Sequence, residues 1–79
     1  MKVTIKYFAA MRECCGKSEE ILETQAINPK QLFGQICGLY PITLALDTLK
    51  VAVNEVYVDF DTPLSEMDTV VFIPPLAGG

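Results

Sequence analysis

Apolar and polar residues alternate at the start of the chain, and this alternation predicts a half-buried strand over residues 2–8. The apolar positions of one face are Val3, Ile5 and Tyr7. Phe8 continues the opposite, polar face. It is therefore either exposed or packed in a small cluster under residues 9–15, which could form one or two helical turns ending at Gly16. The pattern leaves both alternatives open.

The next segments predict an acidic edge strand and an amphipathic helix. Residues 18–24 are weakly strand-like and acidic, as expected for the edge strand of a hairpin with the first strand. Asn28 followed by Pro29 is typical of a helix start, and Pro41 ends this helix. Its apolar residues recur at spacings of three and four, which predicts one broad buried face made of Leu32, Phe33, Ile36, Cys37, Leu39 and Tyr40.

Two glycines lie inside this helix, Gly34 and Gly38. Each costs roughly 1 kcal/mol of helix stability relative to alanine. Tertiary packing must therefore hold the helix, and we expect a close approach of its backbone to the sheet at these two positions.

The second half of the chain predicts a connection over residues 42–48, followed by two short strands over residues 50–54 and 56–58 that are separated by a tight turn. An acidic loop over residues 59–68 and a final strand over residues 69–73 complete it. The final strand is apolar on both faces, as a central strand would be. This order of elements predicts a two-layer α+β domain in which the last strand runs through the middle of the sheet.

Composition limits the class of protein. The chain has 79 residues, of which 51% are hydrophobic, so it should form one domain with a real core over residues 1–79. Its net charge of −4 and its scattered lysines and arginines argue against a nucleic-acid partner. No apolar run is long enough to span a membrane or to form a signal peptide, so we expect a cytoplasmic protein without a membrane partner.

Cysteine chemistry is not expected to carry the function. The three cysteines are Cys14, Cys15 and Cys37, and the chain has no histidine. An odd number of cysteines is not a disulfide framework, and without histidine a zinc site would need unusual ligands. We therefore expect no metal, and buried or half-buried thiols without a catalytic role.

The candidate chemistry lies at the last residues, which we expect to form an extended tail over residues 74–79. Pro74 and Pro75 favour polyproline geometry, with a reach on the order of 18 Å for six residues at about 3.1 Å per residue. Gly78 and Gly79 carry no Cβ, so they could pass through a slot that excludes any other residue. They would present one reactive group, the carboxylate of Gly79, which becomes reactive only when another protein activates it.

Several motifs resemble the family of small sulfur-carrier subunits of molybdopterin synthase (MoaD type), which is a ubiquitin-like β-grasp family. The resemblance covers nearly the whole chain and lies in Tyr7-Phe8-Ala9 with Arg12-Glu13, Ala52-Val53-Asn54, residues 60–64 and above all residues 68–79. The turn at residues 65–68 departs from the family pattern, because it lacks the glycine commonly found before Asp68.

The resemblance implies a mixed sheet with one packed main helix and a C-terminal tail. It also implies that an ATP-dependent activating enzyme adenylates Gly79 and that a sulfur donor protein then leaves a thiocarboxylate there. This chain would bind no cofactor, because the activating enzyme consumes the ATP. The carrier with its thiocarboxylate would dock on the large synthase subunit, in a complex of two small and two large subunits. It would then give its sulfur to a cyclic pyranopterin monophosphate. It would be a sulfur donor and not an enzyme by itself.

The resemblance also assigns roles to single residues. Gly79 would be the modified residue and Gly78 would line the slot, while Phe8, Tyr57 and Ile73 would form a hydrophobic docking face. The tail residues Pro74, Pro75, Leu76 and Ala77 would contact the partner. Rival functions are a thiamine-pathway sulfur carrier, a ubiquitin-like modifier that conjugates to proteins or thiolates tRNA, and a plain binding module with an inert tail.

Overall fold

The fold is taken from a computed structural model, which describes residues 1–75. Its elements are β1 (Lys2–Tyr7), α1 (Ala9–Cys15), β2 (Glu19–Glu23), α2 (Pro29–Leu39), a short 3-10 helix η1 (Leu46–Thr48), β3 (Lys50–Val53), β4 (Val56–Val58) and β5 (Thr69–Ile73). Each predicted strand and helix is present with bounds close to those expected. The 3-10 helix inside the connection between α2 and β3 is an addition that the sequence pattern did not predict.

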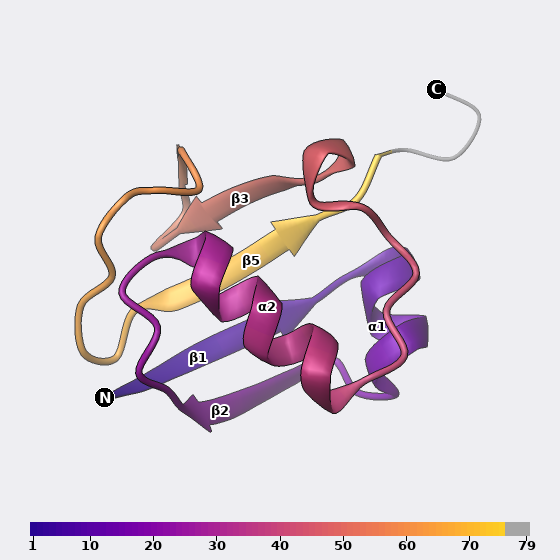
Figure 1. Cartoon of the computed structure of the whole chain (residues 1–79), viewed down its shortest axis with the longest axis horizontal. Helices are drawn as coiled ribbons and strands as arrows, with labels where there is room; N and C mark the ends of the chain where they lie inside the picture. The colour runs from indigo at the N-terminus through magenta and orange to yellow at the C-terminus, as the bar shows by residue number, and fades with distance from the viewer. Residues whose placement is uncertain (76–79) are drawn as a thin grey trace.

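The strands form one mixed sheet in the order β2-β1-β5-β3-β4. β1 and β5 are parallel, whereas the pairs β1–β2, β3–β5 and β3–β4 are antiparallel. The last strand therefore lies in the centre and the acidic strand β2 lies at an edge, as predicted. Figure 1 shows β1 and β5 running side by side toward α1, with the chain leaving the sheet at that end.

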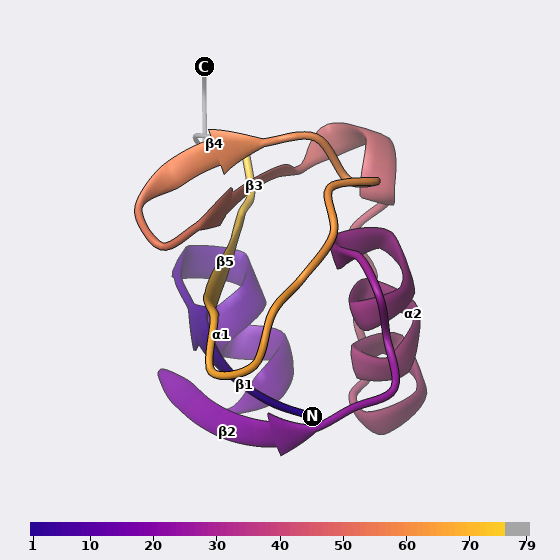
Figure 2. The same cartoon turned by 90° about the vertical axis from the view of Figure 1, so that its left-hand side faces the viewer.

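One face of the sheet is covered by α2, and the core lies between them (Figure 2). Asn28 accepts a hydrogen bond from the Gln31 amide at the start of this helix, as the predicted cap requires. The strand residues in the core include Val3, Ile5, Tyr7, Val51, Val70 and Phe72, and the helix residues are Pro29, Leu32, Phe33 and Ile36. This is the mixed sheet with one packed main helix that the resemblance implied.

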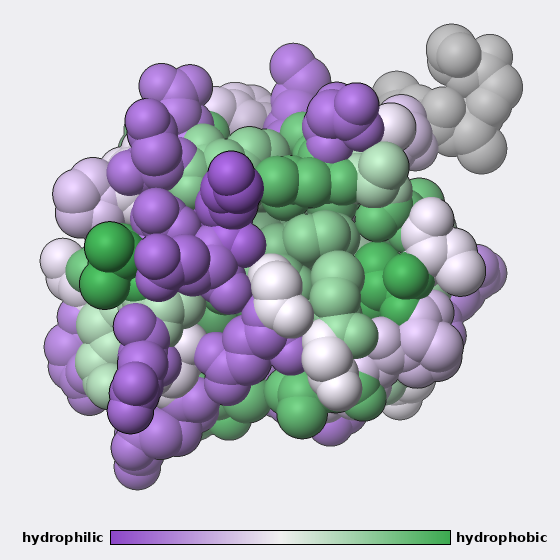
Figure 3. Space-filling model, in the orientation of Figure 1, coloured by the Kyte–Doolittle hydropathy of each residue, from purple (hydrophilic) through white to green (hydrophobic). Residues whose placement is uncertain are grey.

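The buried face of α2 is narrower than predicted. Cys37 is exposed and Leu39 is 54% exposed, so both expectations of burial are wrong. Cys37 lies about 40° further around the helix than Phe33, which is the buried residue at that edge of the core stripe. Leu39 is the last residue of the helix. Figure 3 shows the molecule from the side of α2, with apolar surface in the middle and polar residues to the left.

The expected close approach at the two helical glycines is also wrong. A Cβ built on Gly34 or Gly38 would meet no atom within 4 Å beyond the helix's own neighbouring backbone. Both positions point away from the sheet, so packing does not require glycine there.

The turn that leads into β5 shows why a glycine is favoured at the position before Asp68. Met67 has a φ of 65°, the left-handed conformation in which glycine is favoured. Asp68 then fixes the turn: its carboxylate accepts hydrogen bonds from the Ser65 amide and the Asn54 side chain, both at 2.8 Å. The aspartate thus joins this turn to the β3–β4 turn and sets the register of the central strand.

Candidate functional site

The candidate site begins where β5 ends. Ile73 is half-buried, Pro74 is buried and Pro75 is exposed, so the packed part of the chain extends one residue beyond the strand. Leu76, Ala77, Gly78 and Gly79 lie outside the described residues, and their roles stay predictions. The structure describes the direction of the chain at the start of the predicted tail and the residues around it.

A groove of about 410 Å³ lies beside this point. Its walls come from the end of β1, the start of α1 and the end of β5: Phe8, Ala9, Ala10, Glu13, Ile73, Pro74 and Pro75. Phe8 is 51% exposed, which decides between the two alternatives that the sequence left open. The parallel pairing of β1 with β5 places Phe8, one residue after the Tyr7–Phe72 pair, next to Ile73. The two predicted docking residues therefore share one groove with the first two tail residues.

The start of α1 is strained at this groove. Ala9 has a φ of 48°, which costs a residue with a Cβ roughly 1–2 kcal/mol. The preceding Phe8 is extended and caps the helix with its carbonyl, which accepts from the Met11 amide at 3.0 Å. The sharp change of direction between strand and helix leaves the Phe8 side chain outside the core.

The sheet face opposite α2 supplies the rest of the candidate docking surface. Register places Lys6, Val71, Ala52 and Tyr57 in one row across four strands. Tyr57 is 69% exposed and Val71 is half-buried. Val71 and Ile73 point to the same face because they are two residues apart on one strand. We call the surface formed by Phe8, Ala52, Tyr57, Val71 and Ile73 the open face; Phe8 and Tyr57 are exposed in it, Val71 and Ile73 are half-buried and Ala52 is buried.

Sequence reasoning found part of this surface and missed part. Phe8 and Ile73 are brought together, whereas Tyr57 lies on the edge strand β4, on the far side of β3. Ala52, Val71, Ala10 and Glu13 were missed. For Val71 a signal existed: residues 69–73 are apolar on both faces, although residues 1–75 contain only one helix long enough to cover the sheet.

A polar cluster holds the strand from which Phe8 projects. The Tyr7 hydroxyl donates to the Glu20 carboxylate at 2.6 Å, and the Tyr40 hydroxyl donates to it at 2.8 Å. Lys17 lies 3.5 Å from the same carboxylate. Burial alone would raise the pKa of Glu20, but the hydrogen bonds from Tyr7 and Tyr40, together with the Lys17 charge, outweigh it and lower the pKa. The carboxylate is therefore ionised at neutral pH.

The cysteines supply no obvious nucleophile. Cys15 is buried, and desolvation raises the pKa of its thiol to about 11, so it is protonated at neutral pH. Cys14 is half-buried, whereas the exposed Cys37 lies on α2, outside the groove. Within residues 1–75, no group of three or more cysteine and acidic side chains could hold a metal ion. No helix in the same range is long and apolar enough to cross a membrane.

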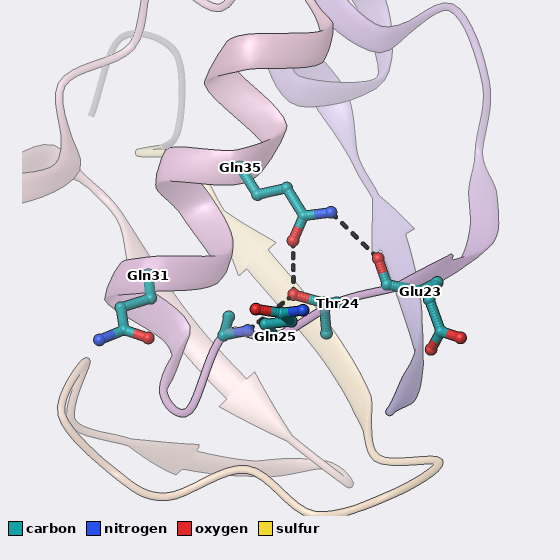
Figure 4. Close-up of a pocket in the computed structure, with 6 residues that line it drawn as sticks. Glu23, Thr24, Gln25, Gln31 and Gln35 are labelled. Atoms are coloured by element: carbon teal, nitrogen blue, oxygen red, sulfur yellow. Dashed lines mark hydrogen bonds between the residues drawn. The ribbon is translucent and has the colours of Figure 1, made fainter.

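A larger hollow of about 510 Å³ lies where β2 passes into α2 (Figure 4). Its polar groups bond to one another: Thr24 donates to the Gln35 side-chain oxygen, and the Gln35 amide donates to the Glu23 carbonyl at 3.1 Å. Figure 1 places this connection at the opposite end of the molecule from the start of the tail. These side chains fasten the helix to the sheet, and we assign the hollow no ligand.

The described residues thus form a site that presents a chain end. The groove and open face contain no paired acid and base and no activated nucleophile, and their exposed centre is apolar. Such a surface can dock a partner while the partner supplies the catalytic groups.

Comparisons with known proteins agree with this description. The model of the ThiS family matches residues 5–79. The molybdopterin synthase sulfur carrier subunit of Mycobacterium tuberculosis is 33% identical over 82 residues, which cover 100% of this chain and 99% of that protein.

Solved structures share the fold. The putative molybdopterin converting factor subunit 1 of Pyrococcus furiosus is 29% identical with a TM-score of 0.78, covering 96% of this chain and 99% of that one. A protein–protein complex of subunits 1 and 2 of the molybdopterin-converting factor of Helicobacter pylori contains a chain that is 22% identical, with a TM-score of 0.70 and complete coverage of both chains. The arrangement of the sheet and helix is that of the ubiquitin-like β-grasp fold.

Proposed function

Because the chain belongs to the ThiS family, we propose that it is the sulfur-carrier subunit of a molybdopterin synthase. The end-to-end similarity to a carrier subunit of that name supports this assignment. The observation that carries it is the path of β5, which runs through the centre of the sheet and delivers the chain to Pro75 beside the apolar groove. The described chain thus ends at Pro75 beside the surface that we propose for docking.

The chemistry that we propose takes place on Gly79. Its carboxylate attacks the α-phosphate of ATP in an activating enzyme, which forms the acyl adenylate and releases pyrophosphate. The terminal sulfur of a persulfide donor then displaces AMP, and a second thiol cleaves the sulfur–sulfur bond to leave the thiocarboxylate. ATP is bound and consumed by the partner, and this chain contributes the acyl group.

The sulfur acceptor is a cyclic pyranopterin monophosphate held by the large synthase subunit. Phe8, Ile73 and Tyr57 dock on that subunit while Gly78 lines its slot, and contacts from residues 74–77 hold the tail. The H. pylori complex of subunits 1 and 2 supports a large-subunit partner. A dithiolene needs two sulfur atoms, which fits an assembly of two small and two large subunits. We infer a cytoplasmic location from the same pathway.

An intact-mass measurement tests the tail chemistry. The chain is incubated with ATP, an activating enzyme and a persulfide donor, and we expect its mass to rise by the difference between one sulfur and one oxygen atom. A variant with one residue added after Gly79 should show no such change, because its α-carboxylate is displaced from the adenylation site. Thiolation of the extended chain on the same carboxylate would contradict the proposal.

The acceptor is tested separately. The thiolated chain is mixed with the large synthase subunit and the pyranopterin precursor, or with a thiazole precursor and its synthase, or with tRNA and its thiolating enzyme. Transfer to the pyranopterin alone supports the proposal. Transfer only to the thiazole precursor or to tRNA would replace it with the corresponding rival function. A chain truncated before Gly78 that kept full function would instead identify a plain binding module.

A further inference from the structure

Two lysines lie on the strands next to β5, on the side of the sheet that carries the open face. Lys6 on β1 pairs with Val71, and Lys50 on β3 pairs with Ile73. Both lysines are exposed. Since paired residues of neighbouring strands point to the same side of a sheet, both ammonium groups extend from the face that carries Val71 and Ile73. One lysine therefore lies on each side of the strand that leads into the tail.

These two charges are not neutralised within the described chain. The ion pairs of residues 1–75 join the N-terminal ammonium to Glu23 at 3.4 Å and Lys17 to Glu20 at 3.5 Å. Glu19 is directly across from Lys6 on β2, but the two side chains form no ion pair. The chain carries a net charge of −4, with ten acidic residues against six basic ones, so a pair of free cations beside an apolar surface runs against its overall charge.

The groove beside these strands carries a charge of the opposite sign. Glu13 on α1 lines the groove together with Phe8 and Ile73. The surface therefore carries cations on β1 and β3, on either side of β5, and a carboxylate on α1 in the adjoining groove. A partner with acidic groups spread evenly over its surface would be repelled at Glu13, whereas one with carboxylates only opposite the strands would match.

We propose that Lys6 and Lys50 are docking cations that pair with carboxylates of the large synthase subunit, which flank an apolar patch at the mouth of its tail slot. This inference rests on the proposed function, because it takes that subunit as the occupant of the open face. The two lysines speed the encounter and fix the rotation of the domain, so that β5 is aimed at the slot. They take no part in the chemistry on Gly79.

Charge reversal tests the proposal. Association with the large subunit is followed by stopped flow for the wild type, Lys6→Glu and Lys50→Glu, at low and at high salt. We expect each reversal to reduce the association rate constant about tenfold at low salt and less at high salt, because long-range attraction is screened. Lys30→Glu is the matched control, since it makes the same change in net charge at an exposed position on α2.

The outcomes separate this inference from the proposed function. If the wild type binds the large subunit and transfers sulfur, but Lys6→Glu and Lys50→Glu behave as Lys30→Glu does, the docking role is wrong and the carrier function stands. If the wild type neither binds nor transfers sulfur, the proposed function itself fails. A loss of association specific to the two strand lysines, with thiolation of Gly79 by the activating enzyme unchanged, supports the proposal.

Discussion

Left-handed backbone at residues other than glycine marks the turns that shape this molecule. Among residues 1–75 it occurs at Ala9, Asn54, Glu55 and Met67. Asparagine tolerates this conformation, whereas Ala9, Glu55 and Met67 each carry a steric cost of roughly 1–2 kcal/mol. Asn54 and Glu55 form the two-residue turn between β3 and β4, where asparagine followed by glycine is favoured. Ala9 lines the candidate groove and directly follows the exposed Phe8.

At Met67 this cost can be removed. We expect Met67→Gly to raise the free energy of unfolding by about 0.5–1 kcal/mol, because relief of the left-handed conformation exceeds the added chain entropy of glycine. The side chain is 53% exposed, so little burial is lost. Urea denaturation gives the comparison. Ser65→Gly is the control, because Ser65 lies in the same turn without a positive φ, and it should lower the free energy of unfolding. If Met67→Gly lowered the free energy of unfolding as much as Ser65→Gly does, the turn would not be strained.

Phe8 is predicted to act in docking and not in folding. Phe8→Ala should weaken binding of the large synthase subunit by about 1–2 kcal/mol, since an apolar anchor at the centre of an interface often contributes this much. Leu39→Ala is the matched control, because Leu39 is 54% exposed against 51% for Phe8 and lies on α2. Calorimetric titration of both variants is decisive. Equal dissociation constants for Phe8→Ala and the wild type would remove Phe8 from the interface.

At the scale of elements, α2 is held by its core contacts and not by its own sequence. Leu32, Phe33 and Ile36 are buried against the sheet, and the ring of Phe33 lies 5.4 Å from that of Phe72. Gly34 and Gly38 lie on its outer surface with open space around them. The helix therefore tolerates two weak helix formers because its other face supplies the stabilisation.

This arrangement predicts opposite effects of one substitution at two glycines. Gly34→Ala should raise the free energy of unfolding by about 1 kcal/mol, because the helix gains propensity and the new methyl group meets nothing. Gly16→Ala should lower it by roughly 1–2 kcal/mol, because Gly16 ends α1 with a φ of 73°. Thermal and urea unfolding measure both. Destabilisation by Gly34→Ala would mean that the outer surface of α2 is not open in solution.

At the scale of the whole molecule, the Glu20 cluster joins parts that are far apart in sequence. Its carboxylate lies on the edge strand β2, and its partners come from β1, from the end of α2 and from the turn after α1. A single ionised group thus links the end of α2, the β1–β2 hairpin and the turn after α1. Hydrogen bonds to such a charge contribute about 1.5–3 kcal/mol each.

This cluster predicts how stability depends on pH. The folded state lowers the pKa of Glu20, so its contribution is fully present above the unfolded pKa of about 4.3 and is lost as the pH falls through the lower, folded value. Glu20→Gln should destabilise the protein by about 1–3 kcal/mol at pH 7. Urea unfolding of both proteins between pH 7 and pH 3 should show this difference shrinking at the acid end. A constant difference across that range would contradict the prediction.

Much of the fold follows from local patterns, because period and turn residues act over short distances. The alternation of residues 2–8 and the Asn28-Pro29 cap correctly predicted a strand and a helix, and the apolar run of residues 69–73 correctly predicted a strand in the centre of the sheet. Errors arose where burial depends on what lies across the molecule. Cys37 and Leu39 fit a helical period, yet the sheet covers a narrower stripe of α2 than that period allows.

Part of the candidate site follows from the sequence and part only from the tertiary structure. The sequence by itself determined which residue types form the predicted tail, because proline restricts the backbone and glycine has no Cβ whatever the fold. Only the tertiary structure decided what stands around the start of that tail. Parallel pairing of β1 with β5 brings Phe8 to Ile73, and the register of three strands places Lys6 and Lys50 on either side. These residues are far apart along the chain, and only strand pairing, which is a non-local choice, makes them neighbours.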